Sequence, residues 1–270
     1  MDITRSGMIN YKSRVSGQLR IKLKGWIRDE KQRAHFPVKS LGRETVITET
    51  EMHSKQSRET ILALVLAAGS SRRMGDFKPL LPFRGRTLIE NSVESVLSGG
   101  AESAVVVTGY RAADVEQTIF RAFEGRVQFV RNEAYAKTDM KRSIQLGVSA
   151  MPKCGAFFLL PGDMPLISQD TFRRLLLERA RYPAPVIFPT LEGRRRHPPL
   201  IDARVIPSIL AFDREGGLRE LWKQYESEII SVPVDDVGVC IDVDTPDDYE
   251  KVLRMDDSNG RNDLNGQDQP

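Results

Sequence analysis

Hydrophobic residues follow two different periods along this chain, and the two periods alternate from about residue 60 onward. Short, mostly apolar runs predict strands buried on both faces of a sheet, at 61–68, 104–108, 127–131, 156–160 and 185–189. Between these runs apolar residues recur at helical spacing and predict helices, at 86–97, 112–123, 140–150, 168–181 and 218–225. This alternation predicts right-handed crossovers, a mainly parallel sheet and a three-layer α/β/α Rossmann-like fold over residues 59–255.

Smaller elements complete the predicted domain. Residues 196–202 are expected to form a hairpin with the strand at 185–189, and residues 239–242 to form the last strand. A helix from Pro246 to about Met255 then closes the domain, because proline is favoured in the first turn of a helix. The polar tail at 256–270 is rich in Gly, Asn and Asp, which predicts disorder.

Residues 1–58 differ from the rest of the chain in charge and in hydrophobic content. They carry 13 Lys and Arg against 6 Asp and Glu, with few large apolar side chains. Residues 18–27 alternate apolar and basic side chains as an amphipathic strand does. A small appended β unit, a disordered basic arm and translated sequence upstream of a natural start at Met52 all fit this segment. We predict weak order or disorder, since so short and polar a segment buries little core.

Charge and cysteine content exclude several classes of protein. The 27 basic and 31 acidic residues after position 58 leave the main domain mildly acidic, which argues against nucleic-acid binding by the whole protein. Cys154 and Cys240 show neither a disulfide framework nor zinc-ligand spacing, as expected in a reducing cytoplasm. No apolar run reaches the length of a signal peptide core or a membrane span, so we expect a soluble cytoplasmic protein that binds no membrane.

The stretch 62–82, LALVLAAGSSRRMGDFKPLLP, combines a buried strand, a small-residue turn and three cations, which are Arg72, Arg73 and Lys78. Such a turn brings backbone N–H groups and cations to the carboxyl edge of a sheet, which predicts a phosphate-binding loop. Gly69 and Gly75 lie too far apart, and are followed by the wrong residues, for a Walker A loop or a dinucleotide fingerprint. An ordinary strand-to-helix loop with solvated arginines is the alternative.

Two carboxylates are expected at the same sheet edge. Asp163 follows the strand at 156–160 within Pro-Gly-Asp-Met-Pro, where the prolines restrict the backbone as suits a metal ligand. An Asx turn or helix cap fits its local sequence equally well. Asp242 and Asp244 would point to one face of the predicted last strand and complete an oxygen site for Mg²⁺. Asp244 or Thr245 could instead cap the final helix.

The run LAAGSSRRMGDFKPLLPFRGRTLIE resembles the signature of the NTP transferase family that includes molybdenum cofactor cytidylyltransferase and its guanylyltransferase relative. The resemblance covers about residues 60–255. It implies Mg²⁺ on Asp163 and, less directly, on Asp244, with Asp163, Arg73 and Lys78 as catalytic residues. It also implies a nucleotide-binding set that comprises Leu66, Ala67, Ala68, Gly69, Ser70, Arg73, Lys78 and Thr108.

The same resemblance places the acceptor near Asn132, Ser143 and His197, and this chain departs from the family pattern at two points there. Asp139 replaces a usual glycine, with an apparent extra residue, and Arg196 replaces the glycine of a Gly-His-Pro motif. A general base is less needed if the acceptor is a phosphate, which is already ionised at neutral pH. The implied reaction is transfer of a nucleotide, CMP from CTP, to a phosphate-bearing acceptor such as a molybdopterin-type cofactor, with release of pyrophosphate.

The resemblance also leads to expectations about substrates and partners, with two alternatives. The substrates are a nucleoside triphosphate and a phosphorylated small molecule, and a molybdoenzyme or its chaperone is an implied protein partner. A sugar phosphate or another small phosphate is an alternative acceptor. A nucleotide-binding accessory protein without turnover is an alternative of a different class, favoured by the departures at Asp139 and Arg196.

Overall fold

The structure is a computed structural model in which residues 13–15, 18–20, 59–71 and 73–264 are described. The chain divides into two units, Met1–Arg58 and Glu59–Pro270. In the first unit, β1 (Ser13–Val15) pairs with β2 (Gln18–Arg20) in antiparallel fashion. The predicted strand at 18–27 therefore begins within β2. The described residues do not include the rest of this predicted strand, Arg72, His35, His53 or the proposed start at Met52. The predictions for these residues stay predictions.

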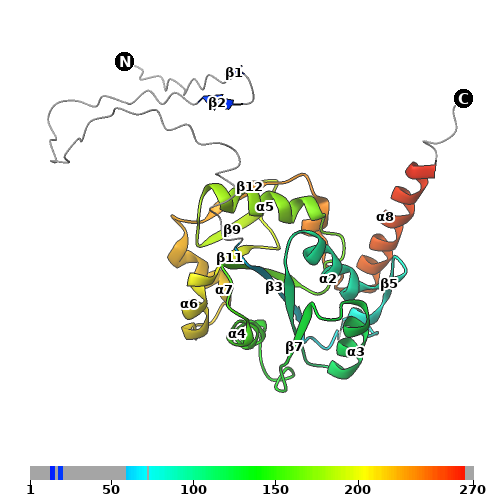
Figure 1. Cartoon of the computed structure of the whole chain (residues 1–270). Coiled ribbons are helices and arrows are strands. Elements are labelled where there is room, and N and C mark those ends of the chain that lie inside the picture. The colour runs from blue at the N-terminus through cyan, green and yellow to red at the C-terminus, as the bar shows by residue number, and fades with distance from the viewer. Residues whose placement is uncertain (1–12, 16–17, 21–58, 72, 265–270) are drawn as a thin grey trace, which may run out of the picture. The chain divides into compact units, whose positions relative to one another are not determined.

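An eight-stranded sheet forms the centre of the second unit (Figure 1). Its order is β10-β9-β11-β8-β3-β6-β7, and β12 pairs with β9 at the side of this path. The bounds are β3 Ile61–Ala67, β6 Ser103–Thr108, β7 Val127–Arg131, β8 Ala156–Pro161, β9 Val186–Leu191, β10 Arg194–Arg195, β11 Leu200–Asp202 and β12 Ile230–Pro233. A separate short pair consists of β4 (Pro82–Phe83) and β5 (Arg86–Thr87). The pairs β3·β6, β3·β8, β6·β7 and β9·β12 are parallel, which confirms the mainly parallel sheet.

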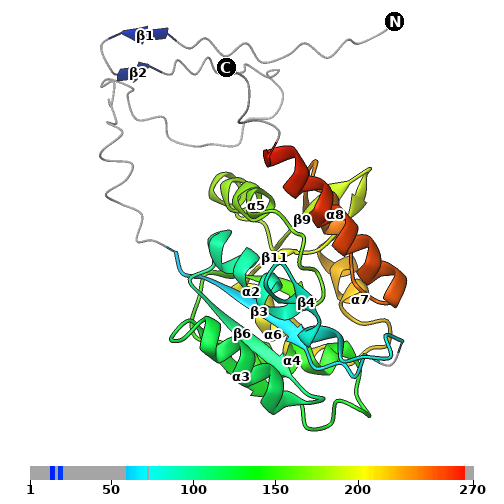
Figure 2. The same ribbon diagram turned by 90° about the vertical axis from the view of Figure 1, so that its right-hand side faces the viewer.

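Helices cover both faces of this sheet (Figures 1 and 2). On one face α2 (Leu88–Ser98), α3 (Ala112–Ala122) and α5 (Gln169–Arg181) pack against alternate residues of β3 and β6. On the other face α4 (Met140–Ala150), α6 (Ile206–Ala211) and α7 (Leu218–Trp222) cover the intervening residues. Because β3 is buried on both sides, its sequence is a continuous apolar run rather than an alternating one. The predicted three-layer fold is confirmed.

One predicted element near the end of the domain is wrong. Residues 239–242 form no strand, because the Asp236 side chain accepts from Gly238 N at 2.9 Å and starts a 3₁₀ helix, Val237–Cys240. The predicted pairing of 196–202 with the strand at 185–189 is confirmed, because Arg196 N donates to Pro189 O and β11 pairs antiparallel with β9. The short strand β10 extends this hairpin, and β11 also pairs with β8. Strand β12, whose residues alternate between half-buried and exposed, was not predicted.

The last helix, α8 (Pro246–Leu264), is longer than predicted, since it continues beyond Met255. Residues 265–270 lie outside the described part of the chain, so the disorder predicted for the tail stays a prediction there. The helix predicted from residue 86 starts at Leu88, with Thr87 as its cap in a capping box with Glu90. Within the residues that the structure describes, no helix has both the length and the hydrophobicity that a membrane span requires.

Candidate active site

A cavity of about 400 Å³ opens at the carboxyl edge of the parallel strands β3 and β8. Its lining comes from the loop after β3, from the segment between β7 and the first turn of α4, and from the end of β8 through Asp163. The described residues that line it are Leu66, Ala67, Ala68, Gly69, Ser70, Ser71, Arg73, Lys78, Pro79, Asn132, Tyr135, Thr138, Asp139, Met140, Ser143, Pro161, Gly162, Asp163 and Asp244. The structure thus brings together the predicted phosphate loop, both predicted metal ligands and two predicted acceptor residues.

Asp163 is held by close packing of Gly162 against the first strand. Gly162 N donates to Leu66 O at 2.9 Å, and Gly162 O accepts from the buried hydroxyl of Ser92 at 3.1 Å. A Cβ at position 162 would lie 2.4 Å from Ile89 Cδ1 and 3.0 Å from Leu66 O. A larger residue would push Ile89 and the Leu66 carbonyl aside, so glycine lets the backbone that carries Asp163 pack directly against β3.

Asp244 reaches the same place from the far end of the chain. Val243 N donates to Asp163 O at 3.1 Å, which ties the two acidic segments together. The Val243 side chain is fully buried in a small apolar cluster with Met74 of the β3 loop and Leu88 of α2. One cluster therefore fixes the positions of the loop, the second acidic segment and α2 relative to one another.

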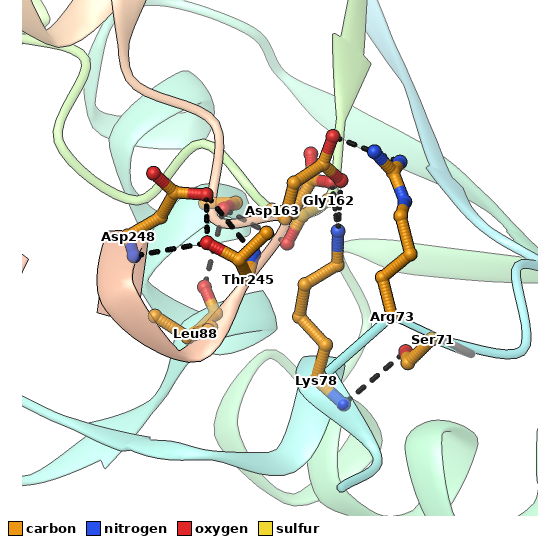
Figure 3. Close-up of polar contacts among 10 residues, drawn as sticks. Ser71, Arg73, Lys78, Leu88, Gly162, Asp163, Thr245 and Asp248 are labelled. Carbon is orange, nitrogen blue, oxygen red and sulfur yellow. Dashed lines mark hydrogen bonds and ion pairs between the residues drawn. The ribbon is translucent and has the colours of Figure 1, made fainter. Parts of the chain in front are cut away.

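The alternative role of helix capping belongs to Thr245 rather than to Asp244. Thr245 Oγ1 accepts from Asp248 N at 3.3 Å, and Asp248 Oδ2 accepts from Thr245 N at 3.0 Å and from its hydroxyl at 2.7 Å (Figure 3). The Asp244 carboxylate is left to face the cavity. The predicted strand that would have aimed Asp242 the same way is absent, and Asp242 does not line the cavity.

The two carboxylates are bridged by Lys78 (Figure 3). Its ammonium donates to Asp163 Oδ2 at 2.6 Å and to Asp244 Oδ1 at 3.0 Å, and Arg73 Nη2 lies 2.9 Å from Asp244 Oδ2. Burial lowers the pKa of Lys78, but attraction to Asp163 and Asp244 outweighs burial and raises this pKa overall. The lysine is therefore charged at neutral pH. Its backbone N donates to Ser71 Oγ at 3.2 Å, which anchors the lysine to the loop.

The donor set fits a divalent metal that prefers oxygen. Asp163 Oδ1 is buried and has no hydrogen-bond partner, which is costly unless a ligand or an ion completes it. Mg²⁺ is usually held by one or two carboxylates, with substrate phosphate oxygens and waters completing the shell. In the described part of the chain no three His, Cys, Asp or Glu residues form a metal cluster, so an ion bound entirely by side chains does not fit.

Asn132 and Ser143, predicted to bind the acceptor, share this cavity with the predicted nucleotide loop. Asn132 is 2% exposed, and its amide donates to Ser143 Oγ and to Thr138 Oγ1, both at 3.0 Å. These bonds shape the loop between β7 and α4. Asp139, the residue that replaces a usual glycine, caps α4 by accepting from Arg142 N at 3.1 Å. The departure therefore has a structural role of its own.

Thr108 and His197 are not among the described residues that line the cavity. The fully buried Thr108 donates its hydroxyl to Glu116 Oε1 at 2.8 Å, which gives this hydroxyl a structural partner. Nucleotide binding by Thr108 stays a prediction. His197 Nδ1 lies 3.4 Å from Leu159 O. Burial lowers the pKa of His197 more than the nearby Asp163 and Asp242 raise it, so the imidazole is neutral at pH 7.

The cavity also includes residues that were not predicted. Tyr135 lies beside Tyr110, with ring centroids 6.1 Å apart, and Tyr110 lies 5.4 Å from Phe77 in an edge-to-face contact. Ser71 takes a positive φ of 53°, which turns the chain toward Lys78. No sequence signal marks Ser71, but the spacing of Phe77, Tyr110 and Tyr135 after three successive parallel strands does bring such residues to one edge.

Comparison with known proteins gives one consistent family. Residues 63–229 match the family described as MobA-like NTP transferase domain. The chain is 27% identical to molybdenum cofactor cytidylyltransferase of Escherichia coli (strain K12) over 186 residues, which cover 69% of this chain and 92% of that protein. It is 29% identical to nicotine blue oxidoreductase of Paenarthrobacter nicotinovorans over 200 residues, which cover 72% of this chain and 96% of that protein.

Solved structures agree with this assignment. A nucleotidyl transferase from Methanothermobacter thermautotroptrophicus superposes with a TM-score of 0.61 at 26% identity, over 73% of this chain and 97% of that one. The family match spans more than half of the present sequence. The chain belongs to the family of MobA-like NTP transferase domains.

Proposed function

We propose that this protein is a Mg²⁺-dependent nucleotidyltransferase that transfers CMP from CTP to a phosphate-bearing acceptor and releases pyrophosphate. The observation that carries the proposal is the meeting of Asp163, Asp244 and Lys78 over the glycine-containing loop in one cavity. Acids and cations in this arrangement suit the opposite charges of a metal ion and a triphosphate. Either charge alone would repel one of these two ligands.

Each group of residues has a separate role in the proposed nucleotidyl transfer. The backbone of 67–71 approaches the triphosphate closely, because Ala67, Ala68 and Gly69 carry almost no side chain there. Asp163 and Asp244 would hold Mg²⁺, which neutralises phosphate charge and orients the triphosphate. Arg73 and Lys78 stabilise the negative charge of the departing pyrophosphate once the nucleotide replaces the carboxylates as their partner.

The acceptor attacks the α-phosphorus with a phosphate oxygen, and the bond from this phosphorus to the bridging oxygen breaks as pyrophosphate leaves. A phosphate is already ionised at pH 7, so no side chain has to remove a proton. The neutral, partly buried His197 is consistent with this, because no strong base is available from it. Catalysis then depends on positioning and electrostatics.

The choice of CTP and of a molybdopterin-type acceptor is supported by the relative from E. coli and by Ala68 in the loop, where users of GTP tend to have glycine. A sugar phosphate or another small phosphate stays the main alternative acceptor. Cytoplasmic location and association with a molybdoenzyme or its chaperone belong to the same proposal. The similarity to an oxidoreductase shows that family membership alone does not fix the activity.

Pyrophosphate release separates these proposals. Purified protein is incubated with Mg²⁺, each of the four common nucleoside triphosphates and a panel of phosphorylated acceptors that includes molybdopterin and sugar 1-phosphates. We expect release that requires an acceptor, is fastest with CTP, and is lost on Asp163→Asn. Nucleotide binding by thermal shift without release from any pair would favour the accessory-protein alternative. Release that is equally fast in the Asp163 variant would contradict the proposed site.

A further inference from the structure

Two buried side-chain atoms in the described part of the chain have no hydrogen-bond partner, and they are Asp163 Oδ1 and Arg196 Nε. Asp163 Oδ1 belongs to an anion that can bind a cation, and Arg196 Nε belongs to a cation that can bind an anion. Unpaired buried polar atoms are rare in folded proteins, and each one is destabilising unless a ligand satisfies it. Asp163 has a role in the proposed metal site, whereas Arg196 has none so far.

Backbone pairing places Arg196 at the same sheet edge as Asp163. Arg196 N donates to Pro189 O in β9 at 2.9 Å, and Pro199 O accepts from Leu159 N in β8 at 3.0 Å. The segment 196–199 therefore crosses between the second halves of β8 and β9, which run parallel because both pair antiparallel with β11. Strand β8 ends two residues before Asp163. Arg196 thus lies on the far side of Asp163 from the phosphate loop.

The other cations of this hairpin and of the cavity have ion-pair partners or are exposed, unlike Arg196. Arg195 forms a two-pronged ion pair with Glu226, with both N–O distances at 2.8 Å. Lys78 and Arg73 are engaged with the metal-binding carboxylates. Arg194 is exposed on the same hairpin and is free to be solvated. Arg196 is half-buried, so its charge has lost part of its hydration without gaining an acidic partner.

We propose that Arg196 binds an oxyanion group of the acceptor, which makes the substrate of this protein an anionic molecule recognised by a guanidinium. This inference rests on the proposed function and adds to it the residue that binds an oxyanion of the acceptor. Guanidinium binds phosphate and carboxylate in the same planar, two-pronged manner, so the oxyanion is either of these groups. A neutral sugar ring or an uncharged heterocycle would leave the half-buried charge of Arg196 unpaired.

Binding of small oxyanions tests the proposal without turnover. The full chain is saturated with Mg²⁺ and α,β-methylene-CTP, which fills the triphosphate loop and cannot transfer its nucleotide. Inorganic phosphate and, separately, acetate are then titrated calorimetrically into wild type, Arg196→Ala, Arg196→Gln and Arg194→Ala. One of the two oxyanions is expected to bind wild type. We expect Arg196→Ala and Arg196→Gln to lower the affinity for this oxyanion by about tenfold to a hundredfold. Arg194→Ala should stay within about twofold of wild type.

The two titrants separate the two sources of the oxyanion. Arg196-dependent binding of phosphate assigns a phosphate to this position, and Arg196-dependent binding of acetate assigns a carboxylate. Wild type that binds the analogue but neither titrant, or Arg196 variants that keep wild-type affinity, would overturn the inference. Failure to bind the analogue at all would instead count against the proposed function. Glutamine keeps an aliphatic stem with a polar but uncharged end. Loss of binding in both folded variants therefore reports the missing guanidinium.

Discussion

The ammonium of Lys78 lies 2.6 Å from Asp163 Oδ2, and this contact explains how two acidic side chains share a half-enclosed cavity. Asp163 and Asp244 meet from segments far apart in the sequence, and without a cation between them they would repel each other. The side chain of Lys78 is only 13% exposed, and it lies close to both carboxylates. Lys78 thus occupies, in this structure, a place between the groups that we assign to the metal.

Replacement of Asp163 by asparagine is expected to reduce pyrophosphate release by about a hundredfold or more, since an amide supplies no charge to a divalent ion. Shape and backbone contacts are kept, because the contacts of Asp163 O and Gly162 N do not involve the side chain. Asp247→Asn, which changes an exposed acid in the first turn of α8, is the matched control. Steady-state rates with equal melting temperatures check the prediction, and equal rates for the two variants would contradict it.

Lys78→Met is expected to change metal binding and catalysis in opposite directions. Removal of the ammonium frees both carboxylates, so Mn²⁺ alone should bind about tenfold more tightly than to wild type. Turnover should fall about a hundredfold, since the leaving pyrophosphate loses a stabilising charge. Paramagnetic titration of Mn²⁺ without nucleotide measures the first effect. Lys223→Met, which alters an exposed ion pair with Glu220, should change neither. Weaker Mn²⁺ binding in the Lys78 variant would show that the ammonium does not compete with the ion.

The sequence predicts best where burial alone decides the structure. The apolar runs at 61–68 and 156–160 identify the two strands that carry the site, because a strand buried on both faces has no other pattern. The loop sequences that come after these two strands identify Asp163 and Lys78 as candidate site residues. Helix 140–150 was predicted with the bounds that the structure has.

Prediction fails where a single side-chain contact decides between two local structures. Residues 239–242 look like a strand, but the Asp236 carboxylate bonds Gly238 N and also caps α5 through Ser168 N, which favours a helical turn. The hydroxyl of Thr108 donates to Glu116, a contact that the sequence did not predict, and nucleotide binding by Thr108 stays a prediction. Pairing of Lys78 with both acids was not predicted either, since a loop sequence does not show which charges meet.

Stability should depend on pH through His197. Burial holds the pKa of this imidazole below its ordinary value of 6.5, so the folded state favours the neutral form and the unfolded state takes up a proton first. Stability is therefore unaffected well above pH 6.5 and decreases as the pH falls from 6.5 toward the folded pKa. Urea unfolding at pH 7.5 and 5.5 checks this by comparing wild type with His197→Gln. The variant should lose less stability between the two pH values, and an identical loss would contradict the assignment.

Arg179 is expected to stabilise the fold without taking part in the site. This side chain, 9% exposed, donates to Glu59 Oε1 at 2.6 Å, to Asp202 Oδ2 at 3.0 Å and to Gly155 O at 3.0 Å. Glu59 precedes β3, Gly155 precedes β8 and Asp202 ends the antiparallel β11, so the whole network lies at the amino edge of the sheet, opposite the cavity.

Arg179→Ala should therefore lower the free energy of unfolding by about 3 to 5 kcal/mol, because it leaves two carboxylates without their buried partner. Arg181→Ala, which removes an exposed cation 3.7 Å from Glu178, should cost at most about 1 kcal/mol. Urea unfolding measures both values, and nucleotide affinity below the unfolding transition supplies the second readout. Affinity should match wild type in both variants, because charges at one edge of the sheet act weakly on a cavity at the other across water with a screening length of about 8 Å. Lost affinity in a folded Arg179 variant would mean that the two edges are coupled.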